Sequence, residues 1–353
     1  MAATAPLWPT CARAQQRVPI ADMHSHFGMI SRRMADSGFA QELRTHGVAL
    51  VAWKMIPDGH FLTRTPTGVE PKAVPAPGEL AAAFQSQLRS VRRYMEASKL
   101  APVLTRADVD RCTQGGEAGI VIASEGADFL EGKVEGLDGA HAAGLRHLQL
   151  VHYIPTPVGD RQTGQPAHGG LSAFGRSVVE ACNAKGILVD LAHCSAEAVD
   201  HALQAAQRPV VWSHGWVDRG GGRWNDRTGL LQRRLSVEHA RKIAQRGGVV
   251  GLWASGLGNP APDWLRGRGG WTVGRGDVAS YAKELLHLAD VLGSEHVAIG
   301  SDIEGLGASW AVNDYAGVRQ VIDQLAELKA PASTIERLAY ANDARVLRES
   351  LAA

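Results

Sequence analysis

The stretch "VPIADMHSH", residues 18–26, sets the pattern from which the fold class follows. In it an apolar run leads into two histidines, His24 and His26, that stand one residue apart. Alternate side chains of a strand point to the same face, so a strand that ends in His-x-His directs two imidazoles at one point. An exposed polar pair at a strand–loop junction would have the same sequence. The residues at the ends of the other strands distinguish between these two interpretations.

Seven further apolar runs follow this one along the chain. Most are nearly continuous Val, Ile, Leu and Ala, which is typical of parallel strands covered on both faces. Stretches with helical spacing lie between them; two open at Ser195 and Ser236, and a third spans 277–293. The eight runs are 18–24, 47–55, 118–125, 145–152, 186–193, 208–214, 247–254 and 296–302.

This alternation of strands and helices, in a chain of 353 residues, predicts an α/β fold of the (β/α)8 type, the TIM barrel. An open, doubly wound sheet is the alternative. No G-x-G-x-x-G motif follows the first strand, which counts against the dinucleotide-binding form of that sheet.

We expect residues 18–353 to form a single domain and residues 1–17 to be a leader. The Ala-Arg-Ala sequence at 12–14 has the form of a signal-peptidase site, so the leader is either the end of an export signal or a disordered segment. The first interpretation makes the protein exported or periplasmic, and the second leaves it cytoplasmic. The proline-rich segment 56–78 is predicted to be a surface excursion, and segment 255–276, with its tryptophans, a flap after the seventh strand.

The composition excludes several kinds of partner. With 45% hydrophobic residues, 21% charged residues and a formal charge of +1, the chain has no bulk attraction for nucleic acid or a membrane surface. It contains no apolar run of about 18 residues, so we expect no transmembrane segment. The four cysteines form no C-x-x-C pair. The expected partner is therefore a small molecule, and a homodimer is left open.

Six of the eight predicted strands end in a residue that can bind a metal or transfer a proton. Each of these residues alone has an ordinary explanation, such as a helix cap or a buried histidine with a hydrogen bond. In a barrel, however, the carboxyl ends of the strands meet at one mouth, where so many imidazoles and carboxylates would be costly without a cation. The residues are His24, His26, Glu125, His152, His193, His214 and Asp302.

Imidazole and carboxylate ligands favour zinc, although manganese, cobalt or iron bind to similar sets. The number of ligands suits two divalent ions that share a carboxylate and a water molecule. In such a centre the shared water is acidified to hydroxide, and the ions polarise the scissile carbonyl group. The sequence therefore predicts a metal-dependent hydrolase.

Five segments resemble those of the membrane (renal) dipeptidase family, a branch of the amidohydrolase superfamily. "IASEGAD" is similar to the family's third-strand segment and contains Glu125. "LQLVHYIPTPVGD" is similar to its T-H-N-x-x-T-P-x-x-D segment and contains His152. "VDLAHCS" and "PVVWSHG" resemble I-D-L-S-H-x-S and P-V-I-x-S-H-S, with His193 and His214. "HVAIGSDIEG" resembles H-V-x-I-G-S-D-F-D-G, with Asp302.

Two further segments extend the resemblance to about residues 18–348. "QRRLSVEHARKIAQRGGVVGL" places Arg233 at the family's arginine, although the neighbouring Arg234 fits almost as well. "YANDARVL" is similar to the terminal G-x-N-x-L-R-V, with Asn342 and Arg345.

The resemblance implies a dipeptidase, and it assigns a role to each site residue. Asp302 would orient the water and pass its proton to the leaving amine. His152 would donate to the carbonyl oxygen as this becomes an oxyanion. Arg233 would pair with a substrate carboxylate, or else be a surface arginine at a helix entry. Of the ligands, the first ion would take His24 and His26, the second ion His193 and His214, and both would share Glu125.

Two departures keep other substrates open. The family usually has His-x-Asp on the first strand, where this chain has His24 and His26, and Glu304 replaces its second acid after Asp302. The alternative function is therefore an amidohydrolase-superfamily enzyme that acts on a non-peptide amide, a lactone or an ester. A barrel that keeps its metal but only binds ligands is a third interpretation, and the complete set of polar residues counts against it.

Overall fold

The structure is a computed structural model that describes residues 17–30, 34–65, 68–115, 117–218, 223–225, 230–254, 270–272, 277–305 and 311–351. Apart from Arg17, the expected leader lies outside these ranges. Of the flap expected at 255–276, only the backbone of 270–272 is described, and Trp264 lies outside.

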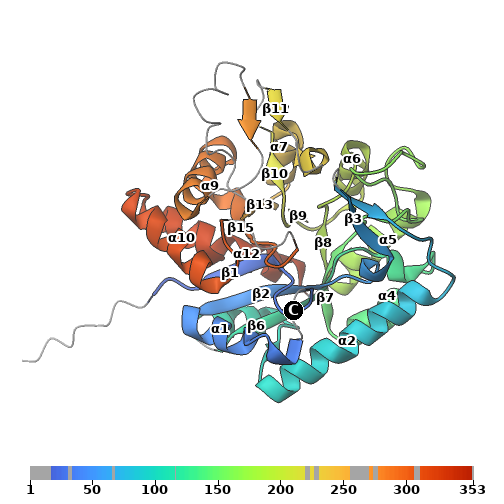
Figure 1. Cartoon of the computed structure of the whole chain (residues 1–353), viewed down its shortest axis with the longest axis horizontal. Helices are drawn as coiled ribbons and strands as arrows, with labels where there is room; N and C mark the ends of the chain where they lie inside the picture. Colours follow the sequence, from blue (N-terminus) through green and yellow to red (C-terminus); the bar gives the residue numbers. More distant parts are fainter. Residues whose placement is uncertain are drawn as a thin grey trace, which may run out of the picture.

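Eight parallel strands form a nearly closed barrel in which each pairs with the next along the chain (Figure 1). Seven of the strands fall within the apolar runs, and β1 extends one residue beyond its run, to Ser25. The barrel closes where the Asp302 amide donates to the His24 carbonyl oxygen at 2.8 Å and Ser25 forms a bridge with Ile303. The predicted (β/α)8 barrel is confirmed, and the open-sheet alternative is wrong. The strands are β1 Ile20–Ser25, β2 Val48–Met55, β6 Gly119–Ser124, β7 Leu145–Gln149, β8 Leu188–Asp190, β9 Val211–Trp212, β13 Val249–Trp253 and β15 Val297–Gly300.

Helices surround this barrel (Figure 1). Side chains cap the helix starts that the sequence predicted: Ser195 and Ser236 each accept a hydrogen bond from a first-turn amide, and Asp277 does the same for a third helix. The helices are α1 Phe39–His46, α2 Glu79–Ser98, α3 Arg106–Thr113, α4 Gly136–Ala142, α5 Ala173–Lys185, α6 Ala196–Ala205, α7 Val237–Gln245, α9 Val278–Leu292, α10 Tyr315–Glu327, α11 Ala332–Glu336 and α12 Asn342–Ser350.

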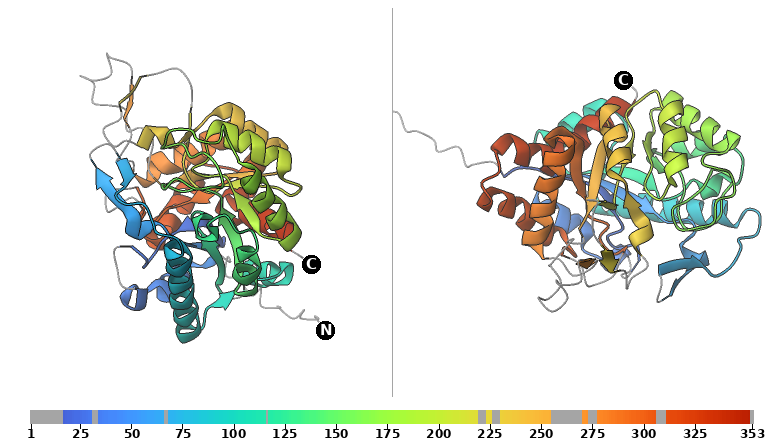
Figure 2. Two further views of the ribbon diagram at one scale, coloured as in Figure 1. Left: turned by 90° about the vertical axis from the view of Figure 1, so that its right-hand side faces the viewer. Right: turned by 90° about the horizontal axis from the view of Figure 1, so that it is seen from above.

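The excursion predicted at 56–78 contains a hairpin that projects at one end of the barrel, opposite the C-terminus (Figure 2). At the end of the hairpin's first strand, Arg64 Nη2 donates to the Gly305 carbonyl oxygen at 2.6 Å, beyond β15. The shorter elements are β3 Leu62–Thr65, β4 Gly68–Pro71, β5 Ala101–Pro102, β10 Trp216–Val217, β11 Arg223–Asn225, β12 Arg234–Leu235, β14 Gly270–Thr272, η1 Met34–Asp36, η2 Gly59–Phe61, η3 Asp128–Leu130, η4 Leu230–Arg233, η5 Ser294–His296 and η6 Arg337–Ala341.

A shift of register in β1 brings both histidines of "ADMHSH" into the barrel. The pairing of β1 with β2 slips by one residue between Asp22 and Ser25. Such a bulge re-aims the side chains that follow it. His24 and His26 then lie together at the mouth, with their Nε2 atoms 3.0 Å apart.

Helix α12 closes the opposite end of the barrel, where the strands begin. Its apolar side chains Val346, Leu347 and Leu351 pack against the first inward residues of the strands. Asn342 donates to the Val297 carbonyl oxygen at 2.7 Å, and Arg345 donates to the Gly247 carbonyl oxygen at 2.9 Å. The two polar residues of the C-terminal motif thus anchor this helix to the starts of β13 and β15.

No helix within the described ranges is both long and apolar enough to cross a membrane.

Candidate metal centre

Seven polar side chains meet at the carboxyl ends of the strands, and all are buried. The sequence had placed each of them at a strand end. The structure brings every one of them into a single cluster. The cluster consists of His24, His26, Glu125, His152, His193, His214 and Asp302.

Glu125, at the end of β6, is the centre of this cluster. Its two carboxylate oxygens face two different sets of imidazole nitrogens. The distances from Oε1 to Nε2 are 3.5 Å for His24, 3.1 Å for His193 and 3.4 Å for His214, and those from Oε2 to Nε2 are 3.0 Å for His26 and 3.3 Å for His152.

The donor set fits divalent cations. Two ring nitrogens, Nε2 of His24 and of His26, lie 3.0 Å apart, and Asp302 Oδ1 lies 3.7 and 3.4 Å from them. Neither ring nitrogen of His193 has a hydrogen-bond partner among the described residues, although the ring is buried. Buried polar atoms without partners are costly, and a cation would satisfy nitrogen lone pairs that converge in this way.

The buried position of these groups sets their charge. Burial lowers the pKa of His24 to about 3 and holds the pKa of His193 and of His214 well below the usual range. Burial would raise the pKa of Glu125, but the charges of the neighbouring imidazoles, His152 first, hold it well below its usual range. These shifts leave neutral imidazoles at His24, His193 and His214 beside an ionised Glu125, which is the state that metal binding needs. At His26 and His152 burial would lower the pKa, but neighbouring carboxylates outweigh it and raise the pKa of both rings, that of His152 to about 9.

Asp302 has the opposite shift to Glu125. Burial, as the largest influence, raises the pKa of its carboxyl group to about 6. Trp253 Nε1 donates to Asp302 Oδ2 at 2.7 Å and fixes its orientation. A carboxyl group with such a pKa can both accept and release a proton near neutrality.

Two site residues adopt the left-handed backbone conformation, with φ of 70° at His193 and 52° at Asp302. Residues other than glycine adopt this conformation rarely, although asparagine, aspartate and histidine do so more often than the rest. Strained positions of this kind gather at functional sites, where the surrounding fold holds them in place.

The sequence model of the membrane dipeptidase family, peptidase family M19, matches residues 12–353. The chain belongs to this family. The resemblance found in the sequence and the expected enzyme class, a metallo-dipeptidase, are therefore confirmed.

Members of the family and related proteins resemble the chain over most of its length. An uncharacterized protein in the pqqA 5′ region of Klebsiella pneumoniae is 26% identical over 77% of this chain and 97% of its own length. Dipeptidase tcpJ of Claviceps purpurea is 25% identical over 74% of this chain, which spans 59% of that protein. For dipeptidase 3 of Rattus norvegicus the identity is 27% over 63% of this chain, which spans 42% of it.

Solved structures show the same fold. The dipeptidase AC, a metallo peptidase of family M19, has a TM-score of 0.76 with 21% identity over 95% of this chain and 99% of its own. A metallo peptidase from Rhodobacter sphaeroides, liganded with a phosphinate mimic of the dipeptide L-Ala-D-Ala, has a TM-score of 0.74 with 22% identity over 94% and 99% of the two chains.

Sequence reasoning missed Ser213, which connects two of the imidazoles. Its Oγ lies 3.0 Å from Nδ1 of His24 and 3.0 Å from Nδ1 of His214. Gly251 and Gly300 border its carbonyl oxygen, and a Cβ at either position would clash with that oxygen. Both glycines are thus needed for the close packing of strands β9, β13 and β15 beneath the centre.

A buried ion pair lies beneath the cluster of seven polar side chains. Lys54 Nζ donates to Asp190 Oδ2 at 2.7 Å and to His147 Nε2 at 3.2 Å. The other oxygen of Asp190 accepts the Ser213 amide at 3.0 Å, and the Lys54 carbonyl oxygen accepts from His26 Nδ1 at 2.8 Å. The pair therefore supports residues on both sides of the centre.

Arg233 and Arg234 differ in their surroundings. The Arg233 side chain is buried at the end of η4, with Nη2 3.2 Å from His214 Nε2, Nε 3.1 Å from Gln162 Oε1, and its guanidinium 5.0 Å from the Trp253 ring. Arg234 is partly exposed and pairs with Asp218 at 3.1 Å. Of the two arginines, Arg233 is the one in contact with the cluster.

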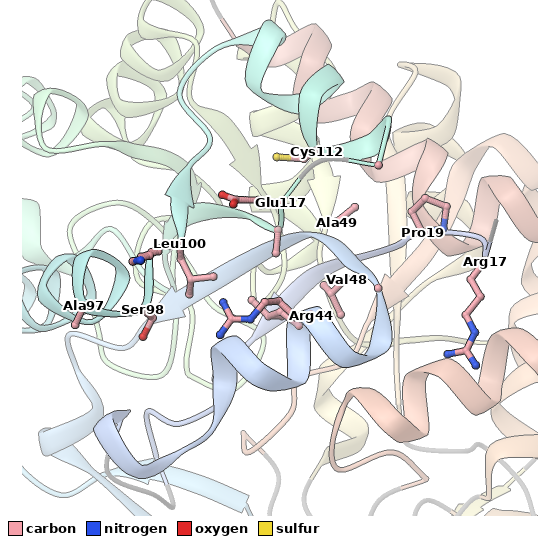
Figure 3. A pocket seen from close by; sticks show the side chains of 15 residues that line it. Arg17, Pro19, Arg44, Val48, Ala49, Ala97, Ser98, Leu100, Cys112 and Glu117 are labelled. Carbon is pink, nitrogen blue, oxygen red and sulfur yellow. The ribbon is translucent and has the colours of Figure 1, made fainter. Parts of the chain in front are cut away.

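The described residues also line a cavity of about 630 Å³ on the other side of the barrel, near the starts of β2 and β6 (Figure 3). Arg17, Arg44 and Glu117 stand around it, and Val48 and Leu100 form part of its apolar lining. None of the seven clustered side chains lines it, so it is separate from the metal centre.

Proposed function

We propose that the chain is a binuclear zinc dipeptidase that hydrolyses the amide bond of small substrates with a free carboxylate. The observation that carries this proposal is the position of Glu125, whose two oxygens face five imidazoles at 3.0–3.5 Å. A carboxylate so placed suits a bridge between two ions. The first ion would take His24 and His26, and the second ion His193 and His214.

Bound divalent ions supply Lewis acidity, which makes water a nucleophile at neutral pH and polarises the scissile carbonyl group. His26 stands where the family usually has an aspartate. A neutral ligand in place of an anionic one leaves more positive charge on the centre, which favours a more acidic water.

Asp302 and His152 would carry the proton and the developing charge. Asp302, with a pKa of about 6, takes a proton from the attacking water and delivers it to the leaving amine. His152 presents Nε2 to the site and donates a hydrogen bond to the carbonyl oxygen as this becomes an oxyanion.

Arg233 is proposed to bind the substrate carboxylate. Its guanidinium lies against His214 and is fixed by Gln162, so a carboxylate paired with it would hold the scissile bond next to the centre. Small dipeptides would then be the first substrates, and longer peptides poor ones.

Metal analysis combined with a substrate panel tests the proposal. After reconstitution with Zn²⁺ and removal of the excess, we expect about two ions per chain and turnover of dipeptides. The panel contains dipeptides, N-acyl amino acids and lactones, because His26 keeps the non-peptide amide, lactone or ester alternative open. Trace metal only, or turnover of lactones without dipeptides, would reject the proposed function.

The variant Arg233→Ala tests whether Arg233 recognises the carboxylate of the substrate. A charge-assisted pair contributes roughly 1.5–3 kcal/mol, so the Michaelis constant for a dipeptide should rise about 10- to 150-fold. The matched substrate is the C-terminal amide of the same dipeptide, for which the variant should behave like the wild type. Equal losses on both substrates would exclude recognition of the carboxylate by Arg233.

A further inference from the structure

His152 has a second partner that the sequence did not reveal. Its Nδ1 lies 2.7 Å from Oδ1 of Asp58, a fully buried residue in the loop after β2. The other oxygen of Asp58 accepts the Tyr153 amide at 3.3 Å. Both oxygens of this carboxylate are thus engaged with one short segment, the residues that follow β7.

We propose that Asp58 is a positioning residue that holds the His152 ring in the orientation from which Nε2 can donate to the developing oxyanion. The proposal rests on the role of His152 in the proposed function. Asp58 itself does not reach the substrate and acts through the histidine.

Hydrogen bonds hold the loop that carries Asp58 against α2, although its composition predicted a surface excursion. The side chain of Gln87, from α2, accepts from the Ile56 amide at 2.7 Å and donates to the Ile56 carbonyl oxygen at 2.8 Å. The Asp58 carbonyl oxygen accepts the Phe61 amide at 2.8 Å and closes the turn. Helix α2 therefore fixes the carboxylate, which in turn fixes the ring.

The chemistry of the contact fixes the direction of the hydrogen bond. The carboxylate oxygen of Asp58 accepts and Nδ1 of His152 donates, so Nε2 can donate to the oxyanion when the ring carries a proton on each nitrogen. Nε2 then points away from Asp58, toward the site, where it lies 3.3 Å from Glu125 Oε2. Without Asp58 the ring could rotate, and Nε2 would lose its alignment with the carbonyl oxygen.

Asp128 provides a matched comparison. Like Asp58 it is a buried carboxyl group close to His152, but neither of its oxygens has a hydrogen-bond partner among the described residues. Burial, and then the charge of Asp58, holds its pKa well above the usual range, which favours the protonated form. An amide at Asp128 therefore removes no hydrogen bond to His152, whereas at Asp58 it replaces the carboxylate that accepts from Nδ1.

The experiment compares Asp58→Asn with Asp128→Asn in the metal-loaded enzyme. For Asp58→Asn we expect kcat on a dipeptide to fall about 10- to 100-fold, as for other residues that orient a functional histidine. KM and the bound metal should stay close to wild type, since the ring acts in the transition state. The affinity for a phosphinate mimic of the dipeptide should fall by a similar factor as kcat. Asp128→Asn should change none of these quantities by more than about twofold.

Three results would overturn the proposal. They are an unchanged kcat in Asp58→Asn, an equal loss in Asp128→Asn, and a rise of KM without a loss of kcat. A merely structural role for Asp58 would lower the stability of both the centre and the fold, and metal content and thermal unfolding reveal such a loss.

A second measurement, on the wild-type His152 ring, tests the contact even if Asp58→Asn fails to fold or the wild type has no dipeptidase activity. Histidine-selective ¹⁵N NMR of the zinc-loaded protein, with His152 assigned by the signal lost in His152→Gln, reports which of the two ring nitrogens carry protons. Protonated Nδ1 supports the hydrogen bond to Asp58, and an unprotonated Nδ1 overturns it. Absent turnover with protonated Nδ1 would reject the proposed function while leaving this contact supported.

Discussion

The two ends of the barrel are built from the same eight strands but have opposite interiors. At the carboxyl ends, imidazoles and carboxylates surround Glu125. At the other end, Leu347 and Val346 of α12 pack against inward apolar residues. The comparison teaches that the fold separates its tasks along the barrel axis, so that polar groups which cost stability gather at one end and the packing that offsets them lies at the other.

The Lys54–Asp190 pair lies between these two layers. It is buried, and it joins the apolar floor to residues beneath the centre. If the two ends are separate in energy as well as in space, substitutions at the carboxyl ends of the strands should affect metal binding and catalysis. Substitutions at the opposite end should affect stability, and substitutions in the Lys54–Asp190 pair should affect all three.

The largest effect is expected at the mouth. Asp302→Asn should lower kcat by about 10²–10⁴-fold, because an amide cannot shuttle the proton. Bound metal and the free energy of unfolding should change little, as measured by elemental analysis and urea denaturation. Asp277→Asn, which keeps a helix cap, is the control and should remain active; near-normal turnover of Asp302→Asn would refute the proton role.

The buried pair should give the next effect. Lys54→Met leaves the charge of Asp190 buried without its partner, and breaking such a pair costs about 3–5 kcal/mol in unfolding free energy. The metal affinity should also fall, because Asp190 supports Ser213. Lys242→Met is the matched control: its ion pairs with Asp200 and Glu238 lie at the surface, where water screens them, and their loss should change stability little.

A substitution at the apolar end of the barrel, where α12 packs, should affect stability alone. Leu347→Ala removes a buried side chain of α12, and a cavity of this kind costs about 2–5 kcal/mol in denaturant unfolding. The metal content and the kcat of the folded fraction should match the wild type. A loss of metal in this variant at temperatures where it is fully folded would break the separation of the two ends.

The smallest effect concerns pH. Burial is the main cause that raises the pKa of Asp343, in α12, from 3.8 to about 7. The folded state thus holds this proton more tightly, and the stability that it contributes is present below about pH 4 and lost as the pH rises to 7. The free energy of unfolding of Asp343→Asn in urea should therefore exceed that of the wild type at pH 8, and the gain should shrink toward pH 4. Equal stabilisation at both pH values would contradict this assignment of the proton.

The strand ends could be found from the sequence because a single rule, parallel strands with polar residues at their carboxyl ends, places His193 and Asp302 at one mouth. Asp58 could not be found in this way. It belongs to a proline-rich segment whose composition predicted only a surface, and the contact with His152 exists because Gln87 of α2 holds the loop inward. Ser213 lay inside a recognised motif, but its contact with both His24 and His214 depends on the bulge in β1 and on how closely three strands approach.

The seam between β1 and β15 has a consequence for how the protein is made. Ser301 donates to the His24 carbonyl oxygen across a separation of 277 residues, and the neighbouring Asp302 amide closes the same seam. At a synthesis rate of about 5–20 residues per second, the last of these residues leaves the ribosome roughly 15–55 s after the first. During that time the nascent chain has an open sheet edge at β1, which favours pairing with other chains. Asp302 can reach the imidazoles only when the final strand arrives, so we expect the cluster to be complete only after almost the whole chain has been made.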